Sequence, residues 1–340
     1  MSVSIRTLGF AAVLLAGCAQ SSDPPDDDGF ALLSKKLSMP CVEYRSVLVH
    51  DIQFAPSGKS FIVAMNAWVS TVDANDLTCT HGRRTTVSKF ADIARDARSL
   101  VVGFIQKAYV TPPDSYEGPL YLNNEVKLPE YDLLDSALSD DGEWLLVVQA
   151  GGKSSIWNVL TEWNVTLENS FQIIPTNSWE YDFEGTTSIS PDAQTFVIGT
   201  PWARKIGVWS REGKLLQVVN APSGATQVGD FIDNEYFLGI TDAQEVFVFS
   251  TYSGEVVNTF RLSVSSPVNS MALDRNTRTL FTGHTNGVIA AWNFDQKRSI
   301  ARTKASNRAI DRLAVHVPSG LGIWWDRGNR FGELLISTTP

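Results

Sequence analysis

A short polar turn with an apolar strand on each side recurs along almost the whole chain. The intervals between successive turn centres range from 39 residues (57 to 96) to 51 residues (141 to 192). Repeats of about 40 to 45 residues are typical of four-stranded propeller blades. Seven turns therefore predict an all-β, seven-bladed β-propeller with four-stranded antiparallel blades. The turns are centred near Ser57, Asp96, Asp141, Asp192, Asn234, Asn276 and Ser319.

The segments around each turn have the composition of propeller strands. A mostly apolar run follows every turn, as in residues 60–65, and such a run indicates a strand that is buried on both faces. A polar loop then leads to a third strand rich in aromatic and β-branched residues, as in residues 245–250. An outer strand follows, as in residues 256–260.

Three stretches resemble parts of WD repeats. Residues 279–292 (TLFTGHTNGVIAAW) look like the second and third strands of a WD-repeat blade, and residues 54–58 (FAPSG) and 189–192 (ISPD) resemble the turn that precedes them. The resemblance covers about residues 45–337 and implies a propeller fold. Bacterial propellers with less regular repeats, including lactonase-like ones, are equally similar.

The chain departs from WD repeats at two motifs. The Gly283-His284 pair falls between the second and third strands, whereas WD repeats place this pair before the innermost strand. The Trp-Asp dipeptide is replaced by Trp157-Asn158, Trp209-Ser210 and Trp292-Asn293.

The last blade has only three predicted strands before the chain ends. Residues 30–37 are apolar enough to supply the missing outer strand, which would close the ring and remove its exposed edges. The alternative is that residues 30–37 merely extend the segment before them.

The N-terminus has the features of a secretory signal. Arg6 precedes a short apolar run from Leu8 to Ala16, and this run is too short to span a bilayer. The run ends in Leu15-Ala16-Gly17-Cys18, which resembles the lipobox of bacterial lipoproteins. The resemblance implies that residues 1–17 are removed and that Cys18 carries diacylglycerol and a further acyl chain such as palmitate. The alternative is an ordinary secretory signal with an incidental cysteine.

The lipobox resemblance also predicts where the protein resides. Ala19 and Gln20 after the cysteine resemble outer-membrane lipoproteins, so we expect a lipid anchor in the bacterial cell envelope, at the outer rather than the inner membrane. Residues 18–29 contain four aspartates and two prolines and are expected to form a flexible tether. The propeller domain is then expected to occupy residues 30–340.

The composition of the chain narrows the range of its partners. Hydrophobic residues make up 43% and charged residues 19%, which suits a globular chain with a large core. The formal net charge is −9, and no Lys/Arg cluster stands out in the sequence, so nucleic acid and anionic membrane surfaces are not expected as partners. No pattern indicates oligomerisation, and we expect a monomer.

Two cysteines remain once Cys18 carries lipid. Because the compartment is oxidising, we expect a disulfide between Cys41 and Cys79. The alternative is that both cysteines are buried free thiols.

Few residues suggest catalysis. His50, His81, His284 and His316 lack the spacing of zinc ligands, and no phosphate-binding loop or nucleophile elbow occurs, so we expect no cofactor and no metal. Carboxylates near the innermost strands could converge in the central channel as a cation-binding or catalytic site, although solvated or turn positions are the alternative. These carboxylates are Asp51, Asp92, Asp135 and Asp230.

One link between blades is unusually long and aromatic. It runs from about Glu168 to Gly185, and loops of this length are commonly functional. We expect its Trp179 and Tyr181, together with Trp202 and Arg204 of the next blade, to form a partner-binding face, because Trp, Tyr and Arg are enriched at binding hot spots. The alternative is that Trp179 and Phe183 pack into the groove between blades.

These features predict a membrane-anchored, non-catalytic scaffold that binds a protein or another envelope component. The alternative is a propeller enzyme, lactonase-like or lyase-like, or a quinoprotein-like cofactor binder that uses the channel mouth. A deep polar pocket with converging carboxylates would favour the enzyme, and a flat aromatic patch would favour the scaffold.

Overall fold

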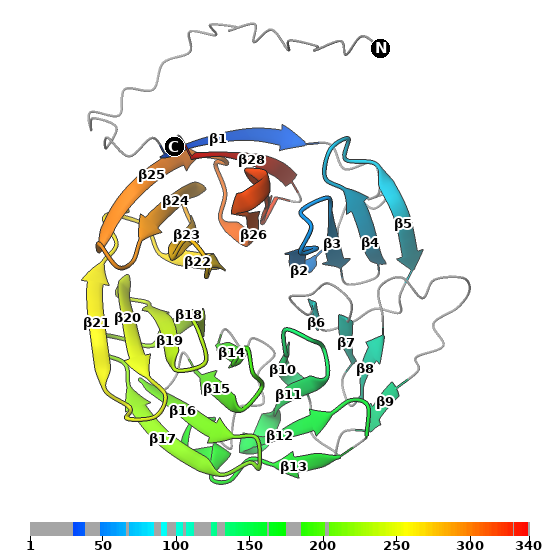
Figure 1. Cartoon of the computed structure of the whole chain (residues 1–340), viewed down its shortest axis with the longest axis vertical. Coiled ribbons are helices and arrows are strands. Elements are labelled where there is room, and N and C mark those ends of the chain that lie inside the picture. Colours follow the sequence, from blue (N-terminus) through cyan, green and yellow to red (C-terminus); the bar gives the residue numbers. More distant parts are fainter. Residues whose placement is uncertain are drawn as a thin grey trace, which may run out of the picture.

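A computed structural model shows a ring of small β-sheets around a central axis (Figure 1). It describes residues 30–37, 48–65, 68–84, 90–93, 100–104, 107–111, 124–127, 133–161, 163–174, 185–200, 204–328 and 330–338.

The described strands form seven four-stranded antiparallel sheets, which are the blades of a propeller. Blade 1 comprises β2 (Val49–Phe54), β3 (Ser60–Met65), β4 (Trp68–Asp73) and β5 (Cys79–Arg84), and blade 2 comprises β6 (Phe90–Ile93), β7 (Leu100–Phe104), β8 (Lys107–Thr111) and β9 (Asn124–Lys127). Blade 3 comprises β10 (Leu133–Leu138), β11 (Trp144–Gln149), β12 (Lys153–Asn158) and β13 (Asn164–Thr166), and blade 4 comprises β14 (Thr186–Ile189), β15 (Thr195–Gly199), β16 (Lys205–Ser210) and β17 (Leu215–Asn220).

The remaining three blades follow in the same way. Blade 5 comprises β18 (Thr226–Phe231), β19 (Tyr236–Thr241), β20 (Glu245–Ser250) and β21 (Val256–Arg261), and blade 6 comprises β22 (Val268–Asp274), β23 (Thr279–His284), β24 (Val288–Asn293) and β25 (Arg298–Lys304). Blade 7 comprises β26 (Ile310–His316), β27 (Leu321–Asp326), β28 (Arg330–Thr338) and β1 (Phe30–Leu37). An all-β propeller with four-stranded antiparallel blades is thus confirmed.

The second strand of each blade lies in the core, as its apolar run predicts. Every residue of β15 and of β23 is buried, because both faces of these strands pack against neighbouring blades. The helices in the described part of the chain are 3-10 turns of three residues, and none has the length and hydropathy to cross a membrane.

Strand β1 closes the ring. It pairs antiparallel with β28 over its whole length, from Phe30 opposite Thr338 to Leu37 opposite Phe331. Leu32 is buried in the core between blades 6 and 7, and Ser34 accepts a hydrogen bond of 2.9 Å from the indole nitrogen of Trp324. Residues 30–37 therefore belong to the propeller and not to the segment before it.

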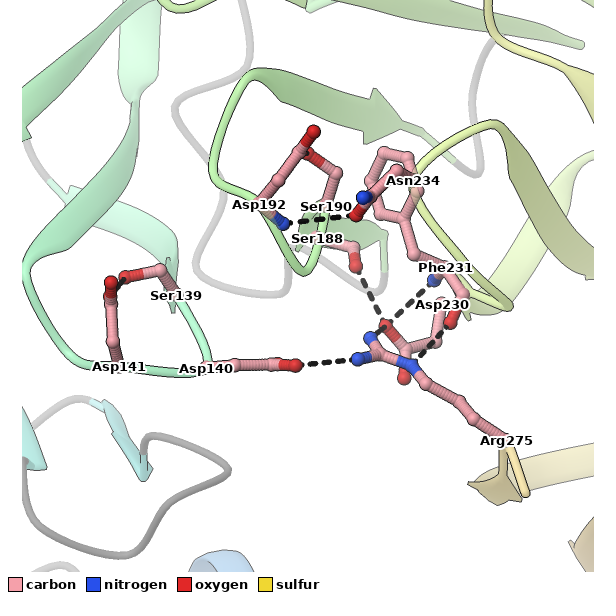
Figure 2. Close-up of polar contacts among 10 residues, drawn as sticks. All are labelled: Ser139, Asp140, Asp141, Ser188, Ser190, Asp192, Asp230, Phe231, Asn234 and Arg275. Carbon is pink, nitrogen blue, oxygen red and sulfur yellow. Dashed lines mark hydrogen bonds and ion pairs between the residues drawn. The ribbon is translucent and has the colours of Figure 1, made fainter.

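Two of the turns between first and second strands share a Ser-x-Asp arrangement (Figure 2). Ser139 donates its hydroxyl to Asp141 at 2.5 Å, and Ser190 donates to Asp192 at 2.7 Å. Each serine oxygen also accepts the backbone N–H five residues later, so the side chain fixes the turn. In the adjacent blades 4 and 5, the Asp192 backbone N–H also donates to Asn234 at 3.0 Å.

Blade 6 contains a buried chain of side-chain hydrogen bonds. The hydroxyl oxygen of Thr282 accepts from the Trp292 indole at 2.9 Å and lies 2.9 Å from Nε2 of His284. Nδ1 of His284 lies 2.7 Å from the carbonyl oxygen of Ser266, which can only accept, so Nδ1 carries the proton. Burial lowers the pKa of His284, although the hydrogen bond to the Ser266 carbonyl opposes this effect. His284 and Trp292 are thus both hydrogen-bonded to the hydroxyl of Thr282, and His284 also bonds to the carbonyl oxygen of Ser266.

Candidate functional site at the central channel

The innermost strands of all seven blades enclose a cavity of about 670 Å³. Polar and apolar groups contribute nearly equally to its lining, and its ionisable side chains are mainly acidic. A ligand that enters would meet a mixed polar and apolar wall with several carboxylates. The ionisable lining residues are Asp51, Asp140, Asp230, Asp274, Arg275 and His316.

Arg275 reaches across the mouth of this cavity from the turn that follows β22 in blade 6 (Figure 2). Its Nη1 lies 2.6 Å from a carboxylate oxygen of Asp140 in blade 3, and its Nη2 lies 3.6 Å from Asp230 in blade 5. Its Nε donates to the carbonyl oxygen of Phe231 at 2.8 Å. The Arg275 cluster, defined as Arg275, Asp140 and Asp230, therefore connects three blades.

Asp230 receives further hydrogen bonds that hold its carboxylate in place. The hydroxyl of Ser188 in blade 4 donates to its Oδ1 at 2.8 Å, and the Phe231 backbone N–H donates to the same oxygen at 2.8 Å. Asp230 of blade 5 therefore contacts blade 4 through Ser188 and blade 6 through Arg275.

Two other predicted channel carboxylates also join neighbouring blades. Asp51 accepts the backbone N–H of Ile52 at 2.8 Å and that of Ile93 in blade 2 at 3.0 Å. Asp135 accepts the hydroxyl of Thr187 in blade 4 at 2.8 Å. Burial raises the pKa of Asp135 to about 6, although the Thr187 hydrogen bond opposes this shift. The side chain of Asp92 lies outside the described residues.

The histidines and carboxylates that the structure describes are potential ligands of a metal ion. Within the described ranges, no three His, Cys, Asp and Glu side chains form a group that could hold one. His316 bonds to the hydroxyl of Ser319 at 2.8 Å and lies 3.1 Å from the carbonyl oxygen of Pro56. His284 is buried inside blade 6. His81 is in β5, but nothing is described of its side chain.

The structure describes only part of the predicted partner-binding face. Trp179, Tyr181 and Trp202 lie outside the described residues, so their arrangement stays a prediction. Arg204 is exposed just before β16, and its carbonyl accepts the Ala221 N–H at 2.8 Å.

The first part of the long link between blades 3 and 4 packs against the propeller. Ile173 and Ile174 are buried in the core of these blades. The Glu168 carbonyl accepts the indole N–H of Trp209 at 2.8 Å. In contrast, 57% of Phe171 is exposed. Ile173, Ile174 and the Glu168 carbonyl thus anchor this segment to the propeller, while the ring of Phe171 faces solvent.

Cys79 is the first residue of β5 and is disulfide-bonded. Cys18 and Cys41 lie outside the described residues, so the pairing of Cys41 with Cys79 and the lipidation of Cys18 stay predictions.

Sequence reasoning did not identify Arg275 or Asp140. Both residues occur in turns that directly follow an innermost strand, where polar residues are usual and signal no function. A charged residue at this position, next to the channel, is the one local signal that could have identified them.

Comparison with known proteins supports the β-propeller fold but gives no information on function. No known protein family matches the sequence, and no curated protein is similar to it. Among solved structures, the β-propeller domain of Cps50 (Swd1) from Myceliophteria thermophila is similar, with a TM-score of 0.69 and 11% sequence identity. The similarity covers 87% of this chain and 98% of that domain.

Proposed function

We propose that this protein is a lipid-anchored, non-catalytic propeller scaffold of the bacterial cell envelope that binds a protein or another envelope component. The proposal that the protein is non-catalytic rests on the hydrogen bonds that the predicted channel carboxylates accept. Asp51, Asp135 and Asp230 each accept a hydrogen bond from a neighbouring blade, which is a structural role. A catalytic carboxylate would instead need to be available to a substrate.

The closure of the ring supports an anchored protein. The proposed lipid on Cys18 is separated from Phe30 by twelve residues (18 to 30), which reach at most roughly 40 Å when fully extended. The first described strand after this segment is β1, whose eight residues all pair with β28. A force on the anchor would therefore act on β1, which is held by its hydrogen bonds to β28 along its whole length.

We place the partner on the face predicted from Trp179, Tyr181, Trp202 and Arg204. Arg204 is exposed, and Phe171 of the long link is 57% exposed, so both described side chains are accessible to a partner. Aromatic and arginine side chains are enriched at binding hot spots.

The experiment is in vivo crosslinking followed by mass spectrometry of the captured proteins and glycans. Tyr181→Ala is compared with Tyr252→Ala, a matched control whose ring is 65% exposed in the turn between β20 and β21. We expect Tyr181→Ala to weaken capture of the main crosslinked species about tenfold and Tyr252→Ala to leave it unchanged. Equal capture by both variants and the wild type would contradict the proposed face.

A second candidate is a propeller enzyme, lactonase-like or lyase-like, or a quinoprotein-like cofactor binder. It is favoured by one observation: Asp140 and Asp230 converge at the mouth of the 670 Å³ cavity. The test is to measure lactone hydrolysis, and the absorbance of added pyrroloquinoline quinone, with wild-type protein and with Asp140→Asn. Activity or cofactor binding that Asp140→Asn abolishes would favour this candidate over the scaffold.

A further inference from the structure

One end of blade 7 concentrates positive charge on an acidic protein. Residues 305–312, which lead from blade 6 into blade 7, and residues 326–330, which connect β27 to β28, together carry four arginines and two aspartates. Their net charge is therefore +2, whereas the formal net charge of the whole chain is −9. Ile310 is opposite Asp326 in the strand ladder, so the two segments meet at the same end of the blade. We call Arg308, Arg327 and Arg330 the arginine cluster.

Arg308 packs against the loop that carries Arg327. A Cβ atom on Gly328 would lie 2.7 Å from both Cδ and Nη1 of Arg308, so the Arg308 side chain is in direct contact with Gly328. The backbone N–H of Arg327 also donates to the carbonyl oxygen of Ala309 at 3.1 Å. The two arginines therefore extend from adjoining segments although they are far apart in sequence.

Arg330 emerges beside the same link. It is directly opposite Asp326 in the ladder, so the two side chains lie on the same face of the blade. Asp326 accepts the hydroxyl of Ser306, a residue of the link that also carries Arg308. The neighbouring Phe331 packs on the opposite face, in the core between blades 7 and 1. Arg330 therefore lies on the blade 6 side of blade 7, where the link enters.

The three guanidinium groups have hydrogen-bond donors to spare. Nε of Arg327 donates to Asp311 at 3.1 Å, yet 68% of the Arg327 side chain is exposed, and its Nη atoms bond to no other described residue. Arg308 and Arg330 are exposed, and their side chains form no hydrogen bond or ion pair with the rest of the described chain. Asp311 and Asp326 are both buried, so arginines are the charged groups that these two segments present to solvent.

This arrangement of donors favours phosphate over a carboxylate. A guanidinium group offers paired donors that match the oxygens of either anion. One arginine satisfies both oxygens of a carboxylate. A phosphate monoester has three terminal oxygens and close to two negative charges at neutral pH, so it can engage more than one arginine.

We propose that the arginine cluster binds the phosphate group of a phosphate monoester, such as a phosphorylated sugar. The site lies between blades 6 and 7, away from Arg204 and the other residues of the proposed partner-binding face at blade 4. It depends neither on that face nor on lipidation of Cys18, so it stands or fails independently of the proposed function.

The test measures binding of glucose 1-phosphate to the full-length protein by isothermal titration calorimetry at low ionic strength. We expect a Kd of about 1 mM or tighter, and binding of glucose or acetate that is at least about tenfold weaker. Inorganic phosphate distinguishes the source of the ligand. Equal binding of inorganic phosphate would assign recognition to the phosphate group alone, and weaker binding would assign a contribution to the sugar; both results support the site.

Two double variants with equal charge changes locate the site. Arg308→Gln/Arg327→Gln removes two charges from the cluster, and Lys205→Gln/Arg261→Gln removes two exposed charges from blades 4 and 5. We expect the first variant to weaken glucose 1-phosphate binding at least about tenfold, because hydrogen bonds to charged groups each contribute about tenfold or more, and the second less than about twofold. Melting curves of both variants check that they fold.

Gly328→Ala tests the geometry of the site without changing any charge. The added Cβ would lie 2.7 Å from Arg308, so the Arg308 side chain has to move. We expect the affinity for glucose 1-phosphate to fall about threefold or more in a protein that still folds, because a displaced guanidinium group loses its bond to the phosphate. Unchanged affinity would overturn the assignment of Arg308 to the site.

Three further results would overturn the proposal. The first is equal loss of affinity in the two double variants, and the second is equal binding of glucose 1-phosphate and either glucose or acetate. The third is tighter binding of a single-stranded oligonucleotide than of glucose 1-phosphate, with the same sensitivity to Arg308→Gln/Arg327→Gln, because the cluster would then be a nucleic-acid surface.

Discussion

Arg275 and Asp140 form an ion pair of 2.6 Å across the channel mouth, although 135 residues of chain separate them. The two side chains come from blades 6 and 3, which are not neighbours in the ring. The pair is partly buried, with 16% of the Arg275 side chain and 33% of the Asp140 side chain exposed. A contact between distant blades resists the separation of the ring, which contacts inside one blade cannot do.

Replacement of Arg275 should destabilise the propeller. Arg275→Gln removes the partner of two carboxylates, and we expect a loss of roughly 1 to 3 kcal/mol in the free energy of unfolding. The double variant Arg275→Gln/Asp140→Asn should recover part of this loss, with a coupling of about 0.5 kcal/mol or more. Urea unfolding of the two single variants and the double variant measures the coupling.

Arg278 provides the matched control. It also pairs with an aspartate at 2.6 Å, Asp295, but 43% and 50% of the two side chains are exposed. Exposed pairs contribute only about 0 to 1 kcal/mol, so Arg278→Gln should change stability less than Arg275→Gln. Equal effects of the two substitutions would show that Arg275 has no special role in the ring.

Asp135 should make stability depend on pH. Burial raises the pKa of its carboxyl from 3.8 to about 6 in the folded protein, so the folded state binds the proton more tightly than the unfolded state. Its contribution is therefore fully present below about pH 4 and is lost as the pH rises through 6. Asp135→Asn, which stays neutral and can still accept from Thr187, should gain stability relative to the wild type between pH 5 and 7.5, by at most about 3 kcal/mol. Thermal melts of both proteins over this range measure the change, and a difference that does not vary with pH would contradict it.

Thr282→Val should be strongly destabilising for a change of nearly equal volume. It leaves the Trp292 indole and Nε2 of His284 without their partner inside a fully buried site. Each unsatisfied buried group costs about 1 to 3 kcal/mol, so we expect a loss of roughly 2 to 4 kcal/mol. Thr259→Val on the exposed outer strand β21 is the control and should cost less than about 0.5 kcal/mol. Chemical unfolding of both variants tests the comparison.

The strands could be predicted from sequence because their signals are local. The apolar run at residues 60–65 matches β3, and the run at 245–250 matches β20. The Arg275–Asp140 pair could not be predicted in this way. Which turn of one blade faces which turn of another depends on the closed ring, and the last blade is complete only after β1 pairs with β28. The pKa of Asp135 was equally out of reach, because it depends on how deeply the neighbouring blades bury the carboxyl.

The disulfide of Cys79 should be formed with Cys41. A bridge that closes the 38 residues from 41 to 79 would stabilise the fold by roughly 4 kcal/mol on the chain-entropy model. Peptide mapping of the unreduced protein should recover the linked pair, and reduction should lower the melting temperature. Alkylation of Cys41 in the denatured, unreduced protein would exclude this pairing.

Cys18→Ser should release the protein from membranes without unfolding it. The substitution removes the thiol that takes diacylglycerol, and two or three acyl chains are what make anchoring stable. The propeller should keep its melting temperature, because its first strand begins at Phe30 and makes all its ladder contacts with β28. Cell fractionation and the intact mass of the mature protein measure the two effects, with Ser22→Ala in the tether as a control that should stay lipidated and membrane-bound. A wild-type protein whose mature N-terminus is unlipidated and lies beyond Cys18 would contradict the anchor.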